Sequence, residues 1–249
     1  MKSQIIIPAR LHSTRLPEKL LLSETGKPLI QHTYESARAA SLPGGICVAA
    51  DDERIAEVVR GFGGQVVMTD PEAASGTDRV AEVAAQLEDV EIIVNVQGDE
   101  PEISGESIDQ VVRLLEENPT EVMSTLATPI RDRAQLEDPA CVKVVLDDSG
   151  RALYFSRSVV PHAREWNDQL LEAEPAHYLQ HLGIYAYRRQ FLLELTTLPR
   201  SGPEQLESLE QLRVLSSGRS ILVGVTSEPS IGIDTPEDYR AFVRKMASG

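Results

Sequence analysis

Residues 5–19 read IIIPARLHSTRLPEK, an apolar run that leads into a polar segment. The apolar run is typical of a short buried strand, and the segment after it carries the cations Arg10, Arg15 and Lys19. Backbone amides and positive charges in a turn after a strand both attract anions, so this junction predicts a site for a phosphate-rich ligand. The same cations can instead form surface ion pairs with nearby acids, and charge alone favours neither interpretation.

The composition of the chain sets this cationic segment apart. The sequence holds 24 Lys and Arg against 39 Asp and Glu, a net charge of −15, which disfavours binding to nucleic acid. No apolar run approaches the ~20 residues that span a bilayer, so we expect no membrane insertion. The N-terminal MKSQIIIPAR lacks the apolar stretch of a secretory signal, which predicts a cytoplasmic protein.

Strand-like runs and helical stretches alternate along the first half of the chain. The runs are QIIIPA (4–9), GICVAA (45–50), GQVVMT (64–69), EIIVNV (91–96), VMSTLATPI (122–130), VKVVL (142–146) and SILVGV (220–225). Helical patterns occupy 29–40, 53–63, 77–88 and 107–118. This alternation predicts an α/β fold, a Rossmann-like three-layer sandwich with a mostly parallel sheet. Ligands of such sheets bind beyond the carboxyl ends of the strands.

The pattern changes between residues 141 and 190. Strand-like pieces at 142–156 and 181–189 flank a polar stretch, and Asp148-Ser149-Gly150 is typical of a hairpin turn. We therefore expect one domain over 1–249 with an inserted antiparallel subdomain over about 141–190.

Carboxylates follow two other predicted elements. In VNVQGDEP (94–101) Asp99 follows a strand, where its oxygens suit Mg²⁺ together with substrate phosphates, although an isolated acidic pair is more often a solvated turn. In IGIDTPEDY (231–239) Asp234 either joins this metal site or caps the helix that follows, as Thr235 also can. SGTDR (75–79) can read a base edge or cap its helix through Thr77 or Asp78.

The ordered set of motifs resembles the 3-deoxy-D-manno-octulosonate (Kdo) cytidylyltransferases, or CMP-Kdo synthetases. The resemblance runs nearly end to end and is most specific in SGTDR (75–79), NVQGDEP (95–101) and ESLEQLR (207–213). One departure is Glu18, where the family's loop usually carries glycine before the lysine. We expect this residue to alter the loop and its charge.

The resemblance implies a fold of the nucleotide-diphospho-sugar transferase type and a reaction of CTP with Kdo that gives CMP-Kdo and pyrophosphate for lipopolysaccharide biosynthesis. It implies Mg²⁺ as cofactor, held by Asp99 and Asp234, and a homodimer formed through the inserted subdomain. The implied catalytic residues are Arg10, Lys19, Asp99 and Asp234. The implied nucleotide-binding residues are Pro8, Ala9, Arg10, Ser13, Arg15, Lys19, Ser75, Gly76, Asp78, Arg79 and Gln97. The implied sugar-binding residues are Gln97, Arg157, His181, Tyr185, Glu210 and Gln211, with the fork of Arg157 suited to the sugar carboxylate.

Two alternatives remain open from the sequence. One is a cytidylyltransferase for another acid sugar, such as an amino-substituted Kdo analogue, since one substituent changes little in a set of motifs. The other is a nucleotide-binding regulator that has lost turnover, although Arg10, Lys19, Asp99 and Asp234 are all present.

Overall fold

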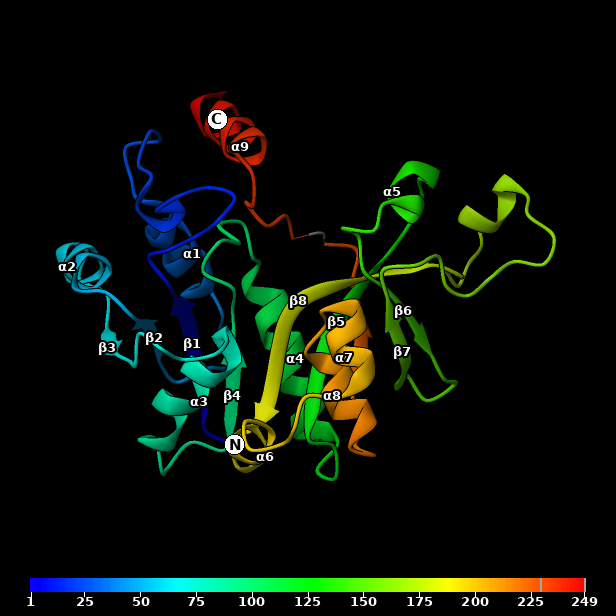
Figure 1. The fold of residues 1–249 in the computed structure, drawn as a ribbon, viewed down its shortest axis with the longest axis horizontal. Helices are drawn as coiled ribbons and strands as arrows, with labels where there is room; N and C mark the ends of the chain where they lie inside the picture. The colour runs from blue at the N-terminus through cyan, green and yellow to red at the C-terminus, as the bar shows by residue number, and fades with distance from the viewer. Residues whose placement is uncertain (229, 249) are drawn as a thin grey trace.

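A single nine-stranded sheet organises the computed structural model, which describes residues 1–228 and 230–248 (Figure 1). Its strands are β1 (Ser3–Ala9), β2 (Ile46–Ala50), β3 (Val66–Met68), β4 (Ile92–Asn95), β5 (Met123–Pro129), β6 (Lys143–Leu146), β7 (Ala152–Ser156), β8 (Leu179–Arg188) and β9 (Leu222–Val225). The order is β3-β2-β1-β4-β8-β5-β9, and β8 alone runs antiparallel to its two neighbours in that order. The predicted α/β fold with a mostly parallel sheet is confirmed.

Helices cover both faces of this sheet. They are α1 (Leu29–Ala37), α2 (Glu53–Gly61), α3 (Gly76–Ala85), α4 (Gly105–Glu117), α5 (Arg133–Glu137), α6 (Arg189–Leu195), α7 (Gly202–Glu207), α8 (Gln211–Ser216) and α9 (Pro236–Ser248), with 3₁₀ turns at Lys19–Leu21 and Asp168–Leu171. Successive side chains of a strand face opposite sides. Ile5 and Ile7 accordingly belong to a core with α1, α2, α4 and α9, whereas Ile6 belongs to a second core with α3, α6 and α8. None of these helices has the length and apolarity needed to cross a bilayer.

The inserted subdomain expected over about 141–190 is antiparallel, but its last strand, β8, belongs to the seven-strand order given above. β6 and β7 form the hairpin across Asp148-Ser149-Gly150, and β6 pairs with the start of β8. β8 itself lies between β4 and β5 at the middle of the sheet. The part of 141–190 that departs from the seven-strand order therefore ends before Leu179. Its hairpin projects from the end of the molecule opposite β3 (Figure 1).

The loops that leave β1 and β4 meet at the carboxyl edge of the parallel strands. A Cβ atom on Gly98 would lie 2.9 Å from the carbonyl oxygen of Pro8, so only glycine permits this approach of the two backbones. The loop before α9 joins them, because the amide of Ile233 donates to the carbonyl of Asp99 at 2.9 Å. This edge brings the predicted phosphate and metal residues together.

Candidate active site

Lys19 lies between two carboxylates that come from distant parts of the chain. Its ammonium donates to the Asp99 carboxylate, to Asp234 Oδ1 at 3.0 Å and to the carbonyl of Ile233 at 3.1 Å. Arg15 contacts the other oxygen of Asp234 at 2.9 Å. The residues predicted to bind phosphate and those predicted to bind metal therefore form one cluster of alternating charge.

The structure also separates the two roles that the sequence left open for Asp234. Thr235 caps α9, since its hydroxyl accepts from the amide of Asp238 at 3.2 Å while the Asp238 carboxylate accepts from the amide of Thr235 at 2.8 Å. The Asp234 carboxylate is thereby left to face Lys19 and Arg15.

The Asp99–Asp234 pair fits Mg²⁺. Both carboxylates reach a single ammonium group, so both can reach a single cation. Among the described residues no group of three or more His, Cys, Asp or Glu surrounds a metal position. Mg²⁺ commonly binds in this way, through one or two carboxylates with substrate phosphates and water completing its octahedron.

Glu18, the departure from the family's loop, precedes Lys19 in a left-handed conformation. Its φ is 52° and its ψ 29°, a region that glycine enters without steric cost and other residues rarely adopt. The Glu18 carboxylate accepts from Arg54 at 2.8 Å. The backbone at this position explains why glycine suits it, and the Arg54 contact neutralises the added charge.

A cavity of about 370 Å³ adjoins this cluster at the edge of the sheet. The predicted nucleotide-binding residues that line it are Pro8, Ala9, Arg10, Ser13, Lys19, Ser75, Gly76, Arg79 and Gln97. Two others do not. Arg15 contacts Asp234, and Asp78 accepts from the hydroxyl of Ser75 at 2.9 Å. Ser75, and neither Thr77 nor Asp78, caps α3.

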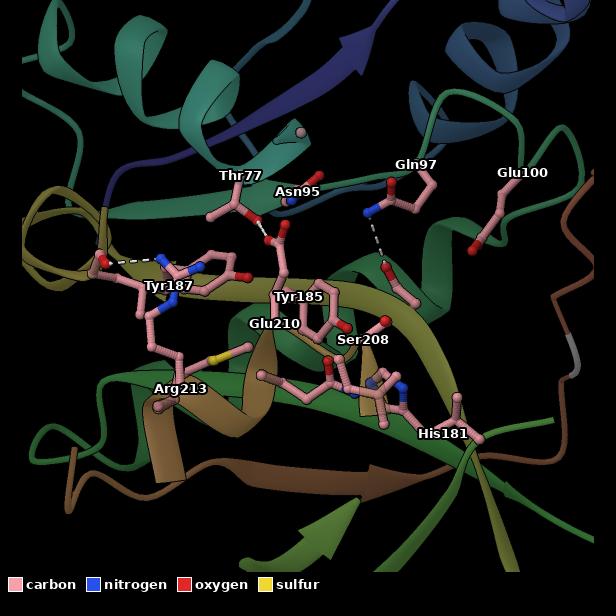
Figure 2. Close-up of a pocket in the computed structure, with 18 of the residues that line it drawn as sticks. Thr77, Asn95, Gln97, Glu100, His181, Tyr185, Tyr187, Ser208, Glu210 and Arg213 are labelled. Atoms are coloured by element: carbon pink, nitrogen blue, oxygen red, sulfur yellow. Dashed lines mark hydrogen bonds between the residues drawn. The ribbon is translucent and has the colours of Figure 1, made fainter. Parts of the chain in front are cut away.

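A second cavity of about 430 Å³ lies between β4, β8 and the segment before α8 (Figure 2). The predicted sugar-binding residues Gln97, His181, Tyr185, Glu210 and Gln211 line it. The two cavities share Gly76, Gln97, Glu210 and Asp234. Two ligands can therefore bind side by side and meet next to Lys19.

Arg157, which was expected to bind the sugar carboxylate, contacts backbone carbonyls in this structure. Its guanidinium donates to the carbonyl of Glu207 at 2.7 Å and to that of Pro139 at 3.1 Å. Within the described chain it lines neither cavity. In this structure its fork joins the end of β7 to backbone carbonyls, and its role at the sugar carboxylate stays a prediction.

Burial keeps several of the groups that line the sugar-side cavity neutral. Burial lowers the pKa of His181 to about 3 and raises that of Tyr185 far above its usual value. His181 pairs through Nε2 with the Thr125 hydroxyl at 3.0 Å. Burial also raises the pKa of Glu100 to about 7, and Ser230 donates to that carboxyl at 2.6 Å. Neutral polar groups of this kind suit a polyhydroxylated ligand.

Sequence reasoning missed several residues that line the sugar-side cavity, among them Thr77, Asn95, Glu100, Tyr187 and Arg213. Thr77 donates to Glu210 at 2.6 Å, which joins α3 to the segment before α8. Arg213 is held by the buried carboxylate of Glu204 through Nε at 2.9 Å. Asn95 had a signal in the sequence, because it is the one polar residue in the run IIVNV.

Comparisons with known proteins agree with this geometry. Residues 4–221 match the family model described as "Cytidylyltransferase". The chain is 51% identical over 249 residues to the 3-deoxy-manno-octulosonate cytidylyltransferase of Rhodopirellula baltica, covering 100% of both proteins. It is 47% identical over 250 residues to the 8-amino-3,8-dideoxy-manno-octulosonate cytidylyltransferase of Shewanella woodyi, covering 99% of each.

Among solved structures, a CMP:2-keto-3-deoxy-manno-octonic acid synthetase in complex with CTP superposes with a TM-score of 0.92 at 42% identity, over 100% of this chain and 99% of the other. Family model, relatives and structure each extend over most or all of the chain. The chain therefore belongs to the cytidylyltransferase family.

Proposed function

We propose that this chain transfers the cytidylyl group of CTP to Kdo, giving CMP-Kdo and pyrophosphate. The observation that carries the proposal is the junction of two cavities beside Lys19, Asp99 and Asp234, one lined by the cations Arg10 and Lys19 and the other by polar side chains of β4, β8 and the segment before α8. Its full-length similarity to a 3-deoxy-manno-octulosonate cytidylyltransferase supports the choice of substrates.

In the proposed reaction the anomeric hydroxyl of Kdo attacks the α-phosphorus of CTP in line, and pyrophosphate leaves. Arg10, Arg15 and Lys19 stabilise the negative charge on the phosphates, so catalysis rests on positioning and electrostatics. We propose that Asp99 and Asp234 hold Mg²⁺, which supplies Lewis-acid stabilisation of the phosphoryl oxygens when bound. Gln97 and Glu210 line both cavities, and we propose that they orient the sugar hydroxyl toward the nucleotide.

We also propose that the enzyme works as a cytoplasmic homodimer and that its product enters lipopolysaccharide biosynthesis. Support for a dimer through the hairpin comes from β7, which pairs only with β6 among the described strands. Its side chains Leu153 and Tyr154 are 60% and 38% exposed. Exposed apolar residues on an edge strand favour association.

The 8-amino analogue of Kdo is a second candidate substrate. The carboxylate of Glu210 lines the sugar-side cavity, whereas Arg213, the one arginine among the described residues that line it, is paired with Glu204. Carboxylates favour an ammonium group by direct electrostatic attraction. The 47% identity to a cytidylyltransferase named for that sugar supports the same possibility.

A pyrophosphate-release assay tests the proposal with CTP, UTP and ATP, each with Kdo or its 8-amino analogue in Mg²⁺. We expect release with CTP and Kdo, and none with UTP or ATP. A higher kcat/KM for the amino sugar would assign the second candidate. Calorimetric binding of CTP with no release from either sugar would instead indicate a regulator.

A further inference from the structure

Asp234 lies in a stretch of chain whose position depends on individual contacts. Residues 231–234 form neither helix nor strand, so no ladder of backbone hydrogen bonds fixes them. The amide of Ile233 donates to the carbonyl of Asp99 at 2.9 Å. The amide of Asp234 itself donates to the Asp238 carboxylate at 3.1 Å, in the first turn of α9. The start of α9 therefore holds the backbone that carries the Asp234 side chain.

The Asp238 carboxylate does more than cap α9. Its Oδ2 accepts from the amide of Thr235 at 2.8 Å, as a reciprocal cap at a helix N-terminus requires. The reciprocal cap of α7 shows the usual extent of such a contact, since Glu204 accepts from the amide of Ser201, the capping residue, at 3.0 Å. The amide of Asp234 precedes the capping residue of α9, so its bond to the same carboxylate is not part of the cap.

The next residue, Tyr239, joins α9 to the segment that carries Lys19. Its hydroxyl donates to the Glu24 carboxylate and accepts from the amide of Glu24 at 3.0 Å. Glu24 closely follows the 3₁₀ turn that begins at Lys19. Of the 13 residues of α9, the structure buries Tyr239 and Phe242, so few apolar side chains hold this helix in place. The Tyr239–Glu24 pair therefore fixes the first turn of α9 relative to the loop that carries Lys19.

We propose that Asp238 and Tyr239 are positioning residues that hold the Asp234 carboxylate where a divalent cation can bind it together with Asp99. The inference rests on the proposed function, in which these two carboxylates hold Mg²⁺. A metal ligand must lie within about 0.5 Å of its productive position. Residues that orient a ligand without touching the metal change metal affinity about 10- to 100-fold when they are replaced. Within the described chain, neither Asp238 nor Tyr239 lines the two cavities, so both act through Asp234.

Asp238→Ala removes the acceptor of the Asp234 amide. Mn²⁺ is the probe, because faster relaxation of water protons reports Mn²⁺ in a ternary complex with protein and CTP, with no sugar present. We expect the dissociation constant of Mn²⁺ in that complex to rise about 10-fold or more. In the pyrophosphate assay the half-saturating Mg²⁺ concentration should rise in parallel, while the KM for Kdo at saturating Mg²⁺ stays within about twofold. Asp238→Asn keeps one acceptor oxygen and should restore most of the affinity.

Asp132→Ala is the matched control. Asp132 caps α5, where its carboxylate accepts from the amide of Gln135 at 2.9 Å. Both substitutions remove a carboxylate that caps a helix, so both should lower the melting temperature. Only Asp238→Ala should weaken the binding of Mn²⁺. Equal Mn²⁺ affinities in the two variants would show that Asp238 acts on stability alone and would overturn the inference.

Tyr239→Phe tests the second residue and keeps the inference testable should Asp238→Ala not fold. We expect the dissociation constant of Mn²⁺ to rise about 3- to 10-fold, as the loss of one hydrogen bond predicts. Tyr34→Phe is its control, because Tyr34 is also buried and its hydroxyl accepts from the amide of Gln65 at 3.2 Å. An unchanged Mn²⁺ affinity in Tyr239→Phe would overturn the role of Tyr239. Failure of wild-type protein with CTP to bind Mn²⁺ at all would instead overturn the proposed metal site, whatever the variants do.

Discussion

Lys19 is the residue on which the geometry of the reacting edge depends. It draws Asp99 and Asp234 to one point although they lie on loops after different elements. Two carboxylates this close repel one another unless a cation lies between them. The lysine therefore keeps the site assembled in the free protein, and its ammonium is already beside the place where phosphates bind.

Asp99→Asn tests the metal-binding role at this scale. We expect turnover in Mg²⁺ to fall about 100-fold or more, because one anionic oxygen is lost at the point where phosphate charge is stabilised. The melting temperature should change little, since Lys19 keeps its contacts with Asp234 and with the carbonyl of Ile233. Pyrophosphate release and a thermal melt measure the two effects. Asp89→Asn, at an exposed residue, is the control, and a near wild-type rate for Asp99→Asn would remove the metal assignment.

His181 predicts a pH dependence of stability. Burial lowers its pKa from about 6.5 to about 3. Between these pH values the imidazole is protonated in the unfolded chain and neutral in the folded chain. The associated stability is present above about pH 6.5 and is lost as the pH falls toward 3, with a loss of about 3 kcal/mol by pH 4. His181→Gln removes this contribution. Its free energy of unfolding, from urea titrations at pH 7 and pH 4, should fall less than that of wild type.

The exposed His162 supplies the comparison for this measurement. His162→Gln should retain the wild-type difference between pH 7 and pH 4. If His181→Gln retains it as well, then the buried imidazole is not the source of the acid sensitivity.

At the scale of elements, the strands and helices of the parallel half were predictable because their periodicity is local. The apolar runs at 4–9, 45–50, 64–69 and 91–96 became β1 to β4, each within a few residues. The position of β8 was not predictable, because its pairing with both β4 and β5 depends on contacts between residues far apart in sequence. The predicted subdomain over about 141–190 therefore includes a strand that lies at the middle of the sheet.

The same distinction applies to the candidate site. Asp99 and Lys19 were found because they follow predicted strands, where ligands of α/β sheets bind. The contacts of Arg157 with the carbonyls of Glu207 and Pro139 were not predictable, because the sequence does not say which carbonyls a guanidinium meets. The polar lining of the sugar-side cavity comes from five separate segments, so no single motif indicates it.

Gly98→Ala tests how closely two elements approach. The added Cβ would lie 2.9 Å from the Pro8 carbonyl, which must push the loop after β4 away from β1. We expect a loss of about 1–3 kcal/mol in the free energy of unfolding and a lower turnover, because Asp99 moves with that loop. Urea titration and the pyrophosphate assay measure both.

Gly61→Ala is the matched control for Gly98→Ala. Gly61 ends α2, and an added Cβ there meets no atom within 4 Å. Its replacement is expected to stabilise the protein by about 0.4–1 kcal/mol. Equal effects of the two substitutions would show that the close contact at Gly98 does not matter.

At the scale of the whole molecule, the hairpin of β6 and β7 is the surface that we propose to lie between two copies of the chain. Leu153→Lys places a charge on the exposed side of β7. A dimer formed through this strand would bury that charge without a partner, which is unfavourable. Light scattering after size exclusion should show a dimer for wild type and a monomer for the variant. Met246→Lys, on α9, is the control and should stay dimeric. A dimeric Leu153→Lys protein would place the interface elsewhere.

The wall common to the two cavities has a thermodynamic consequence. Both cavities are lined by Gly76, Gln97, Glu210 and Asp234. A ligand in one cavity that changes the positions of these side chains also changes the contacts open to a ligand in the other. Linkage requires the effect to be reciprocal. Whatever factor nucleotide occupancy applies to the affinity for the sugar, sugar occupancy applies to the affinity for the nucleotide. Any coupling between the two substrates is therefore carried by these four shared residues.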